Sequence, residues 1–435
     1  MFETFKNAWK IEDLRKKLLF TLFVIVIFRL GCAVPVPFIA PPALQAMVGQ
    51  TGTMLGYIDM LTGGSFSRAT LFALSVTPYI NSSIIIQLLT IAIPALERLS
   101  KEGEEGRKKI TRITRYVGAG IALALAIGYY FLLRGQNALS YTAGFSGVFA
   151  AIVIVFSFTA GSMLIQWMGE QVDSKGIGNG ISILIFAGIV SRFSSVITTI
   201  RDSFGLAMKG ETKYFFLIPL IAVLAIAVIV FIVILNAAER RIPVQYAKRV
   251  VGRKMYGGQS THIPIKVNMS GVMPVIFASA LVSIPGTLGV LLPNLNNPAT
   301  HPYWTGFFNI FKTTGWAYAM LYLLLIIGFN YFYVAVQYNP VEIANNLRNN
   351  NGTIPGYRPG KPTSDFITKC LGKITFIGAL FLGVVAISPI VLSRITGMNI
   401  SLGGTSLLIV VGVALDTSRS LESYMLMRHH KGFLE

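Results

Sequence analysis

The chain has 435 residues, of which 53% are hydrophobic and only 13% are charged, and its mean hydropathy is +0.64. Soluble domains carry about 25% charged residues, so this composition excludes a water-soluble globular protein of this size. The formal net charge is +19. Such a charge is typical of nucleic-acid binding or of the inner face of a membrane, and the placement of the cations decides between the two.

Apolar runs of roughly 20 residues, the length that a helix needs to cross a bilayer, recur along the whole chain. They cover residues 18–34, 71–93, 117–133, 148–168, 181–196, 214–235, 271–292, 316–336, 374–392 and 403–425. None alternates as a membrane β-strand does. We therefore expect an all-α integral membrane protein with ten transmembrane helices, of which the short fifth and the last, polar after Asp416, are the least regular.

The cations lie mostly in the short segments between these runs, on one side of the expected membrane. With the N-terminus inside, the inner segments hold 28 Lys and Arg residues and the outer segments hold 8. Cytoplasmic loops are enriched in Lys and Arg, so the distribution predicts that both termini are cytoplasmic and favours a topology signal over nucleic-acid binding.

Three connecting segments are unusual. Residues 236–268 and 337–373 are long, basic and rich in Gly and Pro, which predicts cytoplasmic hairpins that project from the membrane. The outer segment 35–68 is rich in Gly and Pro but apolar, with Asp59 as its acidic residue. Because a loop in water is more polar, we expect this segment to fold back against protein at membrane depth.

The ten runs divide into two groups of five. The first half is residues 1–175 with four spans plus residues 176–200 with the fifth, and the second half is residues 201–435 with spans six to ten. Since each half has an odd number of spans, a duplicated half must be inverted, as in transporters, so we expect two pseudo-symmetric inverted halves.

The spans contain almost no ionisable chemistry. Apart from Arg192 in the short fifth run and the polar end of the last run, Arg29, near an outer end, is the one charged residue inside them, which argues against proton relays and intramembrane enzymes and predicts no cofactor. Cys32 and Cys370 lie at opposite faces, so neither a disulfide framework nor a metal site is expected. A secondary transporter of a small solute stays open, because hydroxyl and carbonyl oxygens can coordinate sodium. The candidate sodium ligands are Thr77, Asn81, Ser82 and Ser83.

Proline and glycine interrupt several spans. Pro78 falls in the second, Pro274 and Pro285 in the seventh, and Pro389 in the ninth, where they predict tolerated kinks or moving gates. The glycine-rich stretch 176–180 follows a cytoplasmic turn and not a strand, so it predicts a flexible start of the fifth span and not a phosphate-binding loop.

Eight sequence blocks occur in the order in which one family of membrane proteins carries them. They are DMLTGGSFSR at 59–68, TPYINSSIIIQ at 77–87, the basic stretch 107–116, GIGNGIS at 176–182, YAKR at 246–249, QSTHIPIKVN at 259–268, IPGYRPG at 354–360 and GGTSLLIV at 403–410. Together they span almost the whole chain, which resembles the SecY family of protein-conducting channels. The resemblance implies an hourglass pore between the two halves, which opens across the membrane for secreted polypeptides and sideways for signal sequences and membrane helices.

The resemblance also assigns the pore residues. The constriction ring is expected at Val76, Ile80, Ile181, Ile185, Ile276 and Ile409. Branched aliphatic side chains at a narrow point dewet the pore, and the pairs Val76/Ile80 and Ile181/Ile185 are each at helical i,i+4 spacing, so each pair lines one helix face. The plug, at about residues 55–66, is expected to include Leu55, Tyr57, Ile58, Met60, Leu61, Gly63 and Gly64.

The resemblance also implies which residues form the lateral gate and the docking surface. Gln87 and Asn268 are expected at the lateral gate between the second and seventh spans, where polar contacts would set its opening. The cytoplasmic hairpins are expected to bind the motor ATPase SecA and the ribosome, whose phosphates attract cations. The expected contacts are Arg240, Arg241, Lys248, Arg249, Arg253, Lys254 and Arg358.

The family further implies the other partners and the location. The chain is expected to be a non-enzymatic subunit that works with SecE and SecG, carries signal sequences and translocating polypeptides, and lies in the lipid bilayer of a bacterial plasma membrane. It contains no ATP-binding loop motif, so any ATP must be hydrolysed by a partner.

Overall fold

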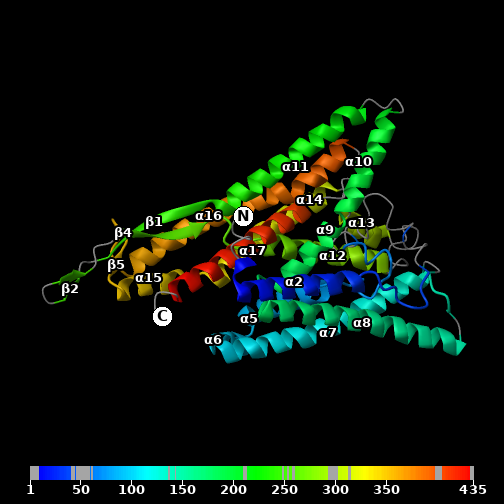
Figure 1. Cartoon of the computed structure of the whole chain (residues 1–435), viewed down its shortest axis with the longest axis horizontal. Coiled ribbons are helices and arrows are strands. Elements are labelled where there is room, and N and C mark those ends of the chain that lie inside the picture. Colours follow the sequence, from blue (N-terminus) through cyan, green and yellow to red (C-terminus); the bar gives the residue numbers. More distant parts are fainter. Residues whose placement is uncertain are drawn as a thin grey trace.

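The structure, a computed structural model, describes residues 9–40, 45, 59, 62–135, 138–142, 144–208, 213–246, 249–251, 254–256, 260–291, 302–311, 315–396 and 404–431. It consists mainly of long helices (Figure 1). In this view α2, α5, α7 and α8 lie along one side, α11, α14, α16 and α17 lie along the other, and α9 and α12 lie between the two groups. Packing of α12 against α5 and of α9 against α17 joins the groups.

The helices of the first group and their neighbours come first in the chain. They are α2 (Glu12–Gly31), α5 (Thr77–Ala92), α6 (Pro94–Lys101), α7 (Glu104–Gly135), α8 (Gly144–Lys175), α9 (Gly180–Ser191) and α10 (Phe193–Met208). The remaining helices are α11 (Lys213–Ala237), α12 (Met273–Leu291), α13 (Pro302–Ile310), α14 (Trp316–Gln337), α15 (Pro340–Asn349), α16 (Lys361–Thr396) and α17 (Gly404–Lys431). Every predicted apolar run falls on one or two of these helices, which confirms the helical membrane fold.

Two of the predicted runs have wrong bounds. The second run begins in a series of turns at residues 71–76, and the helix begins only at Thr77, because Ser75 has a φ of +49° and Pro78 occupies the first turn of α5. Pro78 therefore starts this helix and does not interrupt it. The fifth run is broken at Arg192, which separates the short α9 from α10.

Five helices in the described part of the chain are long and apolar enough to cross a membrane by themselves. A sixth span is possible if α5 and α6 count together, although they are bent by 101° at Ile93, just before Pro94. The protein is thus a multi-pass membrane protein. The count of ten spans stays a prediction, since α9 and α12 are apolar but shorter.

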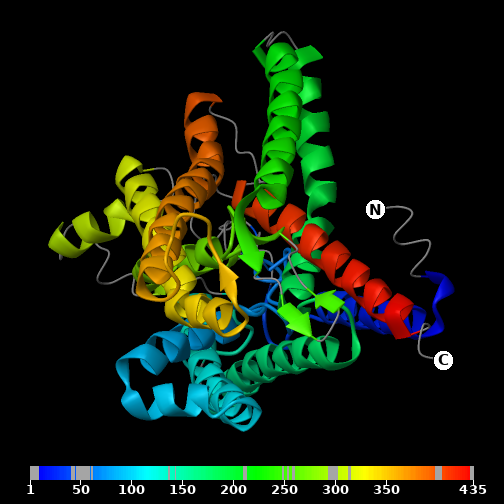
Figure 2. The same cartoon turned by 90° about the vertical axis from the view of Figure 1, so that its left-hand side faces the viewer.

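The two long basic segments form a small sheet that the sequence did not predict. Strand β1 (Glu239–Tyr246) pairs antiparallel with β4 (Ser260–Lys266) and with β5 (Gly352–Thr353), so the order is β4-β1-β5. The tip of the first segment carries β2 (Arg249–Val251) and β3 (Lys254–Tyr256), which pair with each other. Figure 2 looks onto the end of the molecule where this sheet and α15 lie. Both segments therefore belong to one unit.

Side chains from both ends of the chain meet on one side of the molecule. Leu14 of α2, Ile177 and Leu421 of α17 form a small buried cluster. Close by in sequence, the Lys17 ammonium lies 4.2 Å from the centre of the Tyr424 ring, a cation–π distance. The beginning of α2 and the end of α17 are therefore on the same side, as an even number of spans requires.

Candidate functional site

The six predicted ring residues belong to one apolar cluster at the junction of the two helix groups. Five of them are buried and Ile80 is half-buried against the same cluster. They come from four helices and lie near the beginning of each. The residues are Val76 and Ile80 at the start of α5, Ile181 and Ile185 on α9, Ile276 on α12 and Ile409 on α17. The structure thus places all six in one large apolar cluster, and their arrangement as a ring stays a prediction.

The start of α9 is fixed by close backbone contacts. A Cβ on Gly180 would lie 2.1 Å from the Gly169 carbonyl oxygen, so only glycine fits this crossing of α8 and α9. Asn179 Oδ1 caps the helix by accepting a hydrogen bond from the Ser182 amide at 2.9 Å, and Asp173 Oδ1 accepts one from the Gly180 amide at 2.7 Å. The stretch 176–180 is therefore a defined turn that aims Ile181, and its interpretation as a flexible segment is wrong.

Part of the predicted plug lies outside the described residues, namely Leu55, Tyr57, Ile58, Met60 and Leu61. Gly63 and Gly64 are described, with φ values of +67° and +86° that favour glycine, and they begin the series of turns that leads to α5. The following Phe66 is buried, packs on the Tyr129 ring at 4.6 Å between centroids, and accepts a hydrogen bond from the Tyr129 hydroxyl at 2.6 Å. The described outer segment thus folds against α7, as its apolar composition predicts.

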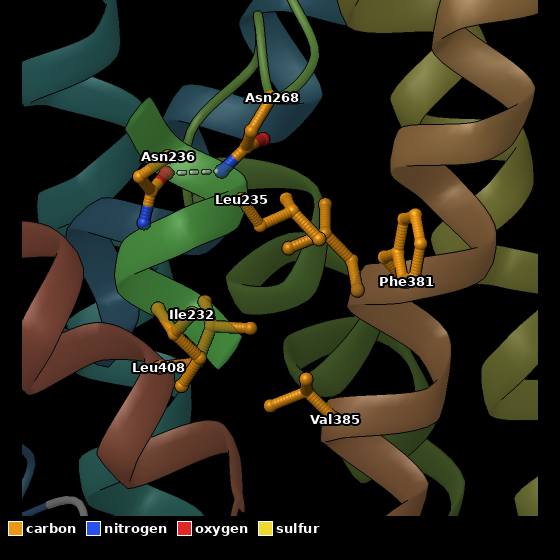
Figure 3. Close-up of a pocket in the computed structure, with 8 residues that line it drawn as sticks. Ile232, Leu235, Asn236, Asn268, Phe381, Val385 and Leu408 are labelled. Atoms are coloured by element: carbon orange, nitrogen blue, oxygen red, sulfur yellow. Dashed lines mark hydrogen bonds between the residues drawn. The ribbon is translucent and has the colours of Figure 1, made fainter. Parts of the chain in front are cut away.

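The two predicted gate residues make separate polar contacts. Helix α5 packs against α12, but the Gln87 side chain on α5 lies close to the Tyr333 side chain of α14. Asn268, which precedes α12, donates from Nδ2 to Asn236 Oδ1 at 2.8 Å (Figure 3). The pocket beside this pair is otherwise lined by apolar residues, such as Ile232 and Leu408. The structure therefore does not bring Gln87 and Asn268 into one hydrogen-bonded pair.

Asn236 is a polar residue that the sequence analysis missed. It lies in the last turn of α11. Its side chain binds Asn268, and its carbonyl oxygen accepts a hydrogen bond from Arg419 Nη2 of α17 at 2.7 Å. It thus joins both ends of the first basic segment to α17. Nothing in the sequence signals this contact, because an asparagine at the end of an apolar run is usual for a helix terminus.

The predicted docking cations lie on the sheet and beside it. Arg240 and Arg241 are exposed on β1, where Arg241 also pairs with Glu239 at 2.7 Å. Arg249 and Lys254 lie on the tip strands β2 and β3. Lys248 and Arg253 fall outside the described residues.

Arg358 lies in the second basic segment, on a turn that other contacts hold. Gly356 and Gly360 have φ values of +87° and +105°, and the Arg358 carbonyl accepts a hydrogen bond from the Thr363 hydroxyl at 2.8 Å. The ring of Tyr357 packs on Phe366 at 4.2 Å. The guanidinium is exposed at the tip of this fixed turn, which suits a specific contact with a partner.

The structure gives little support to the candidate sodium site of hydroxyl and carbonyl oxygens at the second span. Ser82 is fully buried and its hydroxyl donates to the Tyr79 carbonyl oxygen of its own helix at 2.8 Å. Among the described residues there is no group of three or more His, Cys, Asp and Glu side chains that could hold a metal ion.

Comparison with known proteins gives consistent matches. The SecY family model matches residues 70–418. The protein translocase subunit SecY of Thermotoga maritima is 42% identical, with 100% of this chain and 98% of that protein covered.

Solved structures match in fold. One concerns the plug domain of SecY and the closed state of its translocation channel, with a TM-score of 0.66 at 20% identity over 94% of this chain and 92% of that one. Another is the channel of a canine ribosome–channel complex from the endoplasmic reticulum, with a TM-score of 0.60 at 18% identity and the same coverage. Since the family model covers most of the chain and the translocase subunit matches along its full length, this chain belongs to the SecY family.

Proposed function

We propose that this chain is the channel subunit of a protein translocase, which moves unfolded secretory polypeptides across the membrane and inserts membrane helices into it. The observation that carries the proposal is that all six aliphatic residues assigned to the ring, which come from α5, α9, α12 and α17, belong to one buried apolar cluster. A narrow point lined by such side chains excludes water and ions when closed, and it fits around a passing chain without binding it. No ionisable group is needed for this task.

The halves, the plug and the gate complete this proposal. The pore lies between residues 1–200 and residues 201–435, with the ring at their junction. The plug, about residues 55–66, seats against the outer side of the ring and leaves when a chain enters. Helices α5 and α12 separate to let a signal sequence reach lipid, with Gln87 and Asn268 on the two sides of that gate. The packing of α5 on α12 and the buried turns before α5 support this assignment.

The docking surface is the β4-β1-β5 sheet with its tip and the Arg358 turn. A ribosome or the motor ATPase SecA binds there through the cations of β1 and the exposed Arg358, and ATP is hydrolysed by the motor and not by this chain. The likeness to a channel from a ribosome–channel complex supports a ribosome as partner. SecE and SecG complete the translocase. The location is a bacterial plasma membrane with both termini cytoplasmic, which the meeting of α2 and α17 on one side supports.

Reconstitution tests the function directly. The chain is placed in liposomes with SecE, SecG and SecA, and supplied with ATP and an unfolded precursor that carries a signal sequence. Accumulation of protease-protected precursor inside the vesicles is the expected result, and an Arg358→Glu channel serves as a docking-defective control. Vesicles that protect no precursor, although the wild-type protein is folded and the motor is active, contradict the proposal.

A further inference from the structure

Asp59 is an ionisable group with 1% of its surface exposed, in the segment assigned to the plug. Burial of a carboxylate is costly unless it is paired and hydrogen-bonded. Its two oxygens have different partners: Oδ1 accepts a hydrogen bond from the Ser67 amide at 2.7 Å, and Oδ2 lies 2.9 Å from Nη2 of Arg192. One carboxylate thus joins a local turn to a residue far away in the sequence.

The local turn is a compact hydrogen-bonded unit. The Asp59 carbonyl oxygen accepts hydrogen bonds from the Gly64 amide at 2.9 Å and from the Thr62 hydroxyl at 3.1 Å. The same hydroxyl accepts one from the Phe66 amide at 3.3 Å. Both the backbone and the side chain of Asp59 are hydrogen-bonded within this unit. A force on the Asp59 carboxylate therefore moves residues 62–67 with it.

Arg192, the cationic partner of Asp59, lies at the end of a helix that contains predicted ring residues. It is the C-terminal cap residue of α9, the helix that carries two of the ring residues. Its side chain is 31% exposed, so water can replace the carboxylate if the pair separates. The ion pair is therefore suited to repeated opening and closing.

Gly63, in the turn that contains Asp59, packs against the end of α9 that Arg192 caps. A Cβ at this position would lie 2.8 Å from the Gly188 carbonyl oxygen of α9 and 3.2 Å from Nη1 of Arg29 on α2, so only glycine fits. Nη1 of Arg29 is buried and has no hydrogen-bond partner among the described residues. The Gly63 turn thus packs between the end of α9 and the Arg29 side chain of α2, which aligns Asp59 with Arg192. By contrast, a Cβ on Gly64 would meet nothing within 4 Å.

We propose that the Asp59–Arg192 ion pair, aligned by the fit of Gly63 against α9, is a latch that holds the plug on the end of the ring helix and sets how strong a signal sequence must be to open the channel. This inference rests on the proposed function. The latch couples the two parts directly, since α9 carries both Ile181 and, at its end, Arg192. Displacement of α9 by an arriving signal sequence weakens the pair, and separation of the pair frees the turn.

The test measures discrimination between an intact and a defective signal sequence. Proteoliposomes with SecE, SecG and SecA receive matched precursors, and the ratio of defective-signal to intact-signal transport is recorded together with the ion conductance of idle vesicles. Asp59→Asn and Arg192→Gln should each raise this ratio about tenfold, since a hydrogen bond to a charged group is worth that much or more. The double variant should resemble either single variant, because both remove one interaction.

Matched variants separate the latch from general damage. Arg201→Gln removes a cation from exposed α10, close to Arg192 in sequence, and should leave both readouts at wild-type values. Arg192→Lys keeps the charge and should restore most of the discrimination. Gly63→Ala should raise the ratio more than Gly64→Ala, although both glycines have positive φ. If Asp59→Asn is not monodisperse in detergent, the comparison of Arg192→Lys with Arg192→Gln decides the question.

The outcomes separate the two proposals. Wild-type vesicles that fail to protect any precursor overturn the proposed function. Wild-type transport combined with unchanged discrimination in Asp59→Asn and Arg192→Gln overturns the latch alone. Additive effects in the double variant also overturn it, because the two residues then act independently.

Discussion

Helices α5 and α12 begin in the same way but follow very different segments. Each has a proline as its second residue, Pro78 and Pro274, and each has a ring isoleucine two residues later, Ile80 and Ile276. The chain reaches α5 through buried turns, whereas it reaches α12 from β4, a strand of the sheet that the two basic segments form. The isoleucine assigned to the ring thus follows a buried segment in α5 and a basic segment, proposed to bind partners, in α12.

For the proposed channel, this comparison predicts that its two gate helices are controlled separately. The start of α5 is controlled by the protein itself, through the plug and its contacts with α7 and α9. The start of α12 is controlled from outside, through the sheet and the Asn236–Asn268 contact. Opening then requires both events, release of the internal segment and engagement of the sheet.

The strongest test locks the internal segment. Ser65 is fully buried and lies against the thiol of Cys32. In Ser65→Cys, oxidation should form a disulfide with Cys32, and transport should stop almost completely because the turn before α5 cannot leave. A reductant should restore transport, and the same substitution in a Cys32→Ala background should be insensitive to oxidation. Normal transport through the cross-linked protein would show that this segment does not need to move.

A second change acts on the ring itself. Ile276→Asn places an amide in the apolar cluster, where Ile276 is 7% exposed, at a cost of about 3 kcal/mol from the lost isoleucine packing and the unpaired amide. The closed ring should become hydrated, so idle vesicles should conduct ions and precursors with defective signals should pass. A conductance assay on single channels checks this, with Ile276→Leu as the control. An unchanged conductance would remove Ile276 from the ring.

A third change acts on the external side. Arg358→Glu should lower the affinity for SecA about tenfold, since a hydrogen bond from an ionised group contributes roughly 1.5–3 kcal/mol. The residue is exposed and its turn is held by backbone contacts, so the amount of folded protein should not change. Binding titrations at two salt concentrations check this, and Lys361→Glu, which makes the same charge change three residues away, measures the effect of charge alone. Equal losses in both variants would contradict a specific contact.

The smallest expected effect concerns the contact between the sheet and α12. Asn268→Ala should lower the free energy of unfolding by about 1 kcal/mol, because a neutral hydrogen bond contributes that amount. Asn236→Ala should cost a similar amount, and the double variant should cost little more than either, since the two amides bind each other. Thermal unfolding in detergent measures all three. Fully additive losses would show that the pair does not couple α11 to α12.

The sequence predicted the helices well, because their apolar runs are long and continuous. It predicted the start of α5 wrongly, since the left-handed backbone of Ser75 and the turns before it are held by hydrogen bonds from Tyr129 of α7 and Ser162 of α8 and leave no periodic signal. The sheet was missed because its strands are short and lie in basic segments, and only Ile242 and Val244 with Ile263 and Ile265 show the alternation of a strand.

The candidate functional residues also differ in how far the sequence predicts them. The ring residues could be named only through the family resemblance, since one aliphatic residue in a membrane span looks like any other. Contacts between distant segments, such as Asp59 with Arg192 and Arg419 with Asn236, could not be predicted at all from a single sequence. They depend on how the helices cross, and that is determined by packing over the whole molecule.

The aliphatic nature of the six ring side chains has one further consequence for the clients of such a channel. Isoleucine and valine offer dispersion contact but neither donors nor acceptors, so the proposed waist cannot recognise a sequence by the positions of its hydrogen-bonding groups. Every passing stretch meets the same apolar surface, whatever the order of its side chains. The choice of cargo must therefore be complete before a polypeptide arrives at the waist, and the channel contributes tolerance where the segments around it contribute selection.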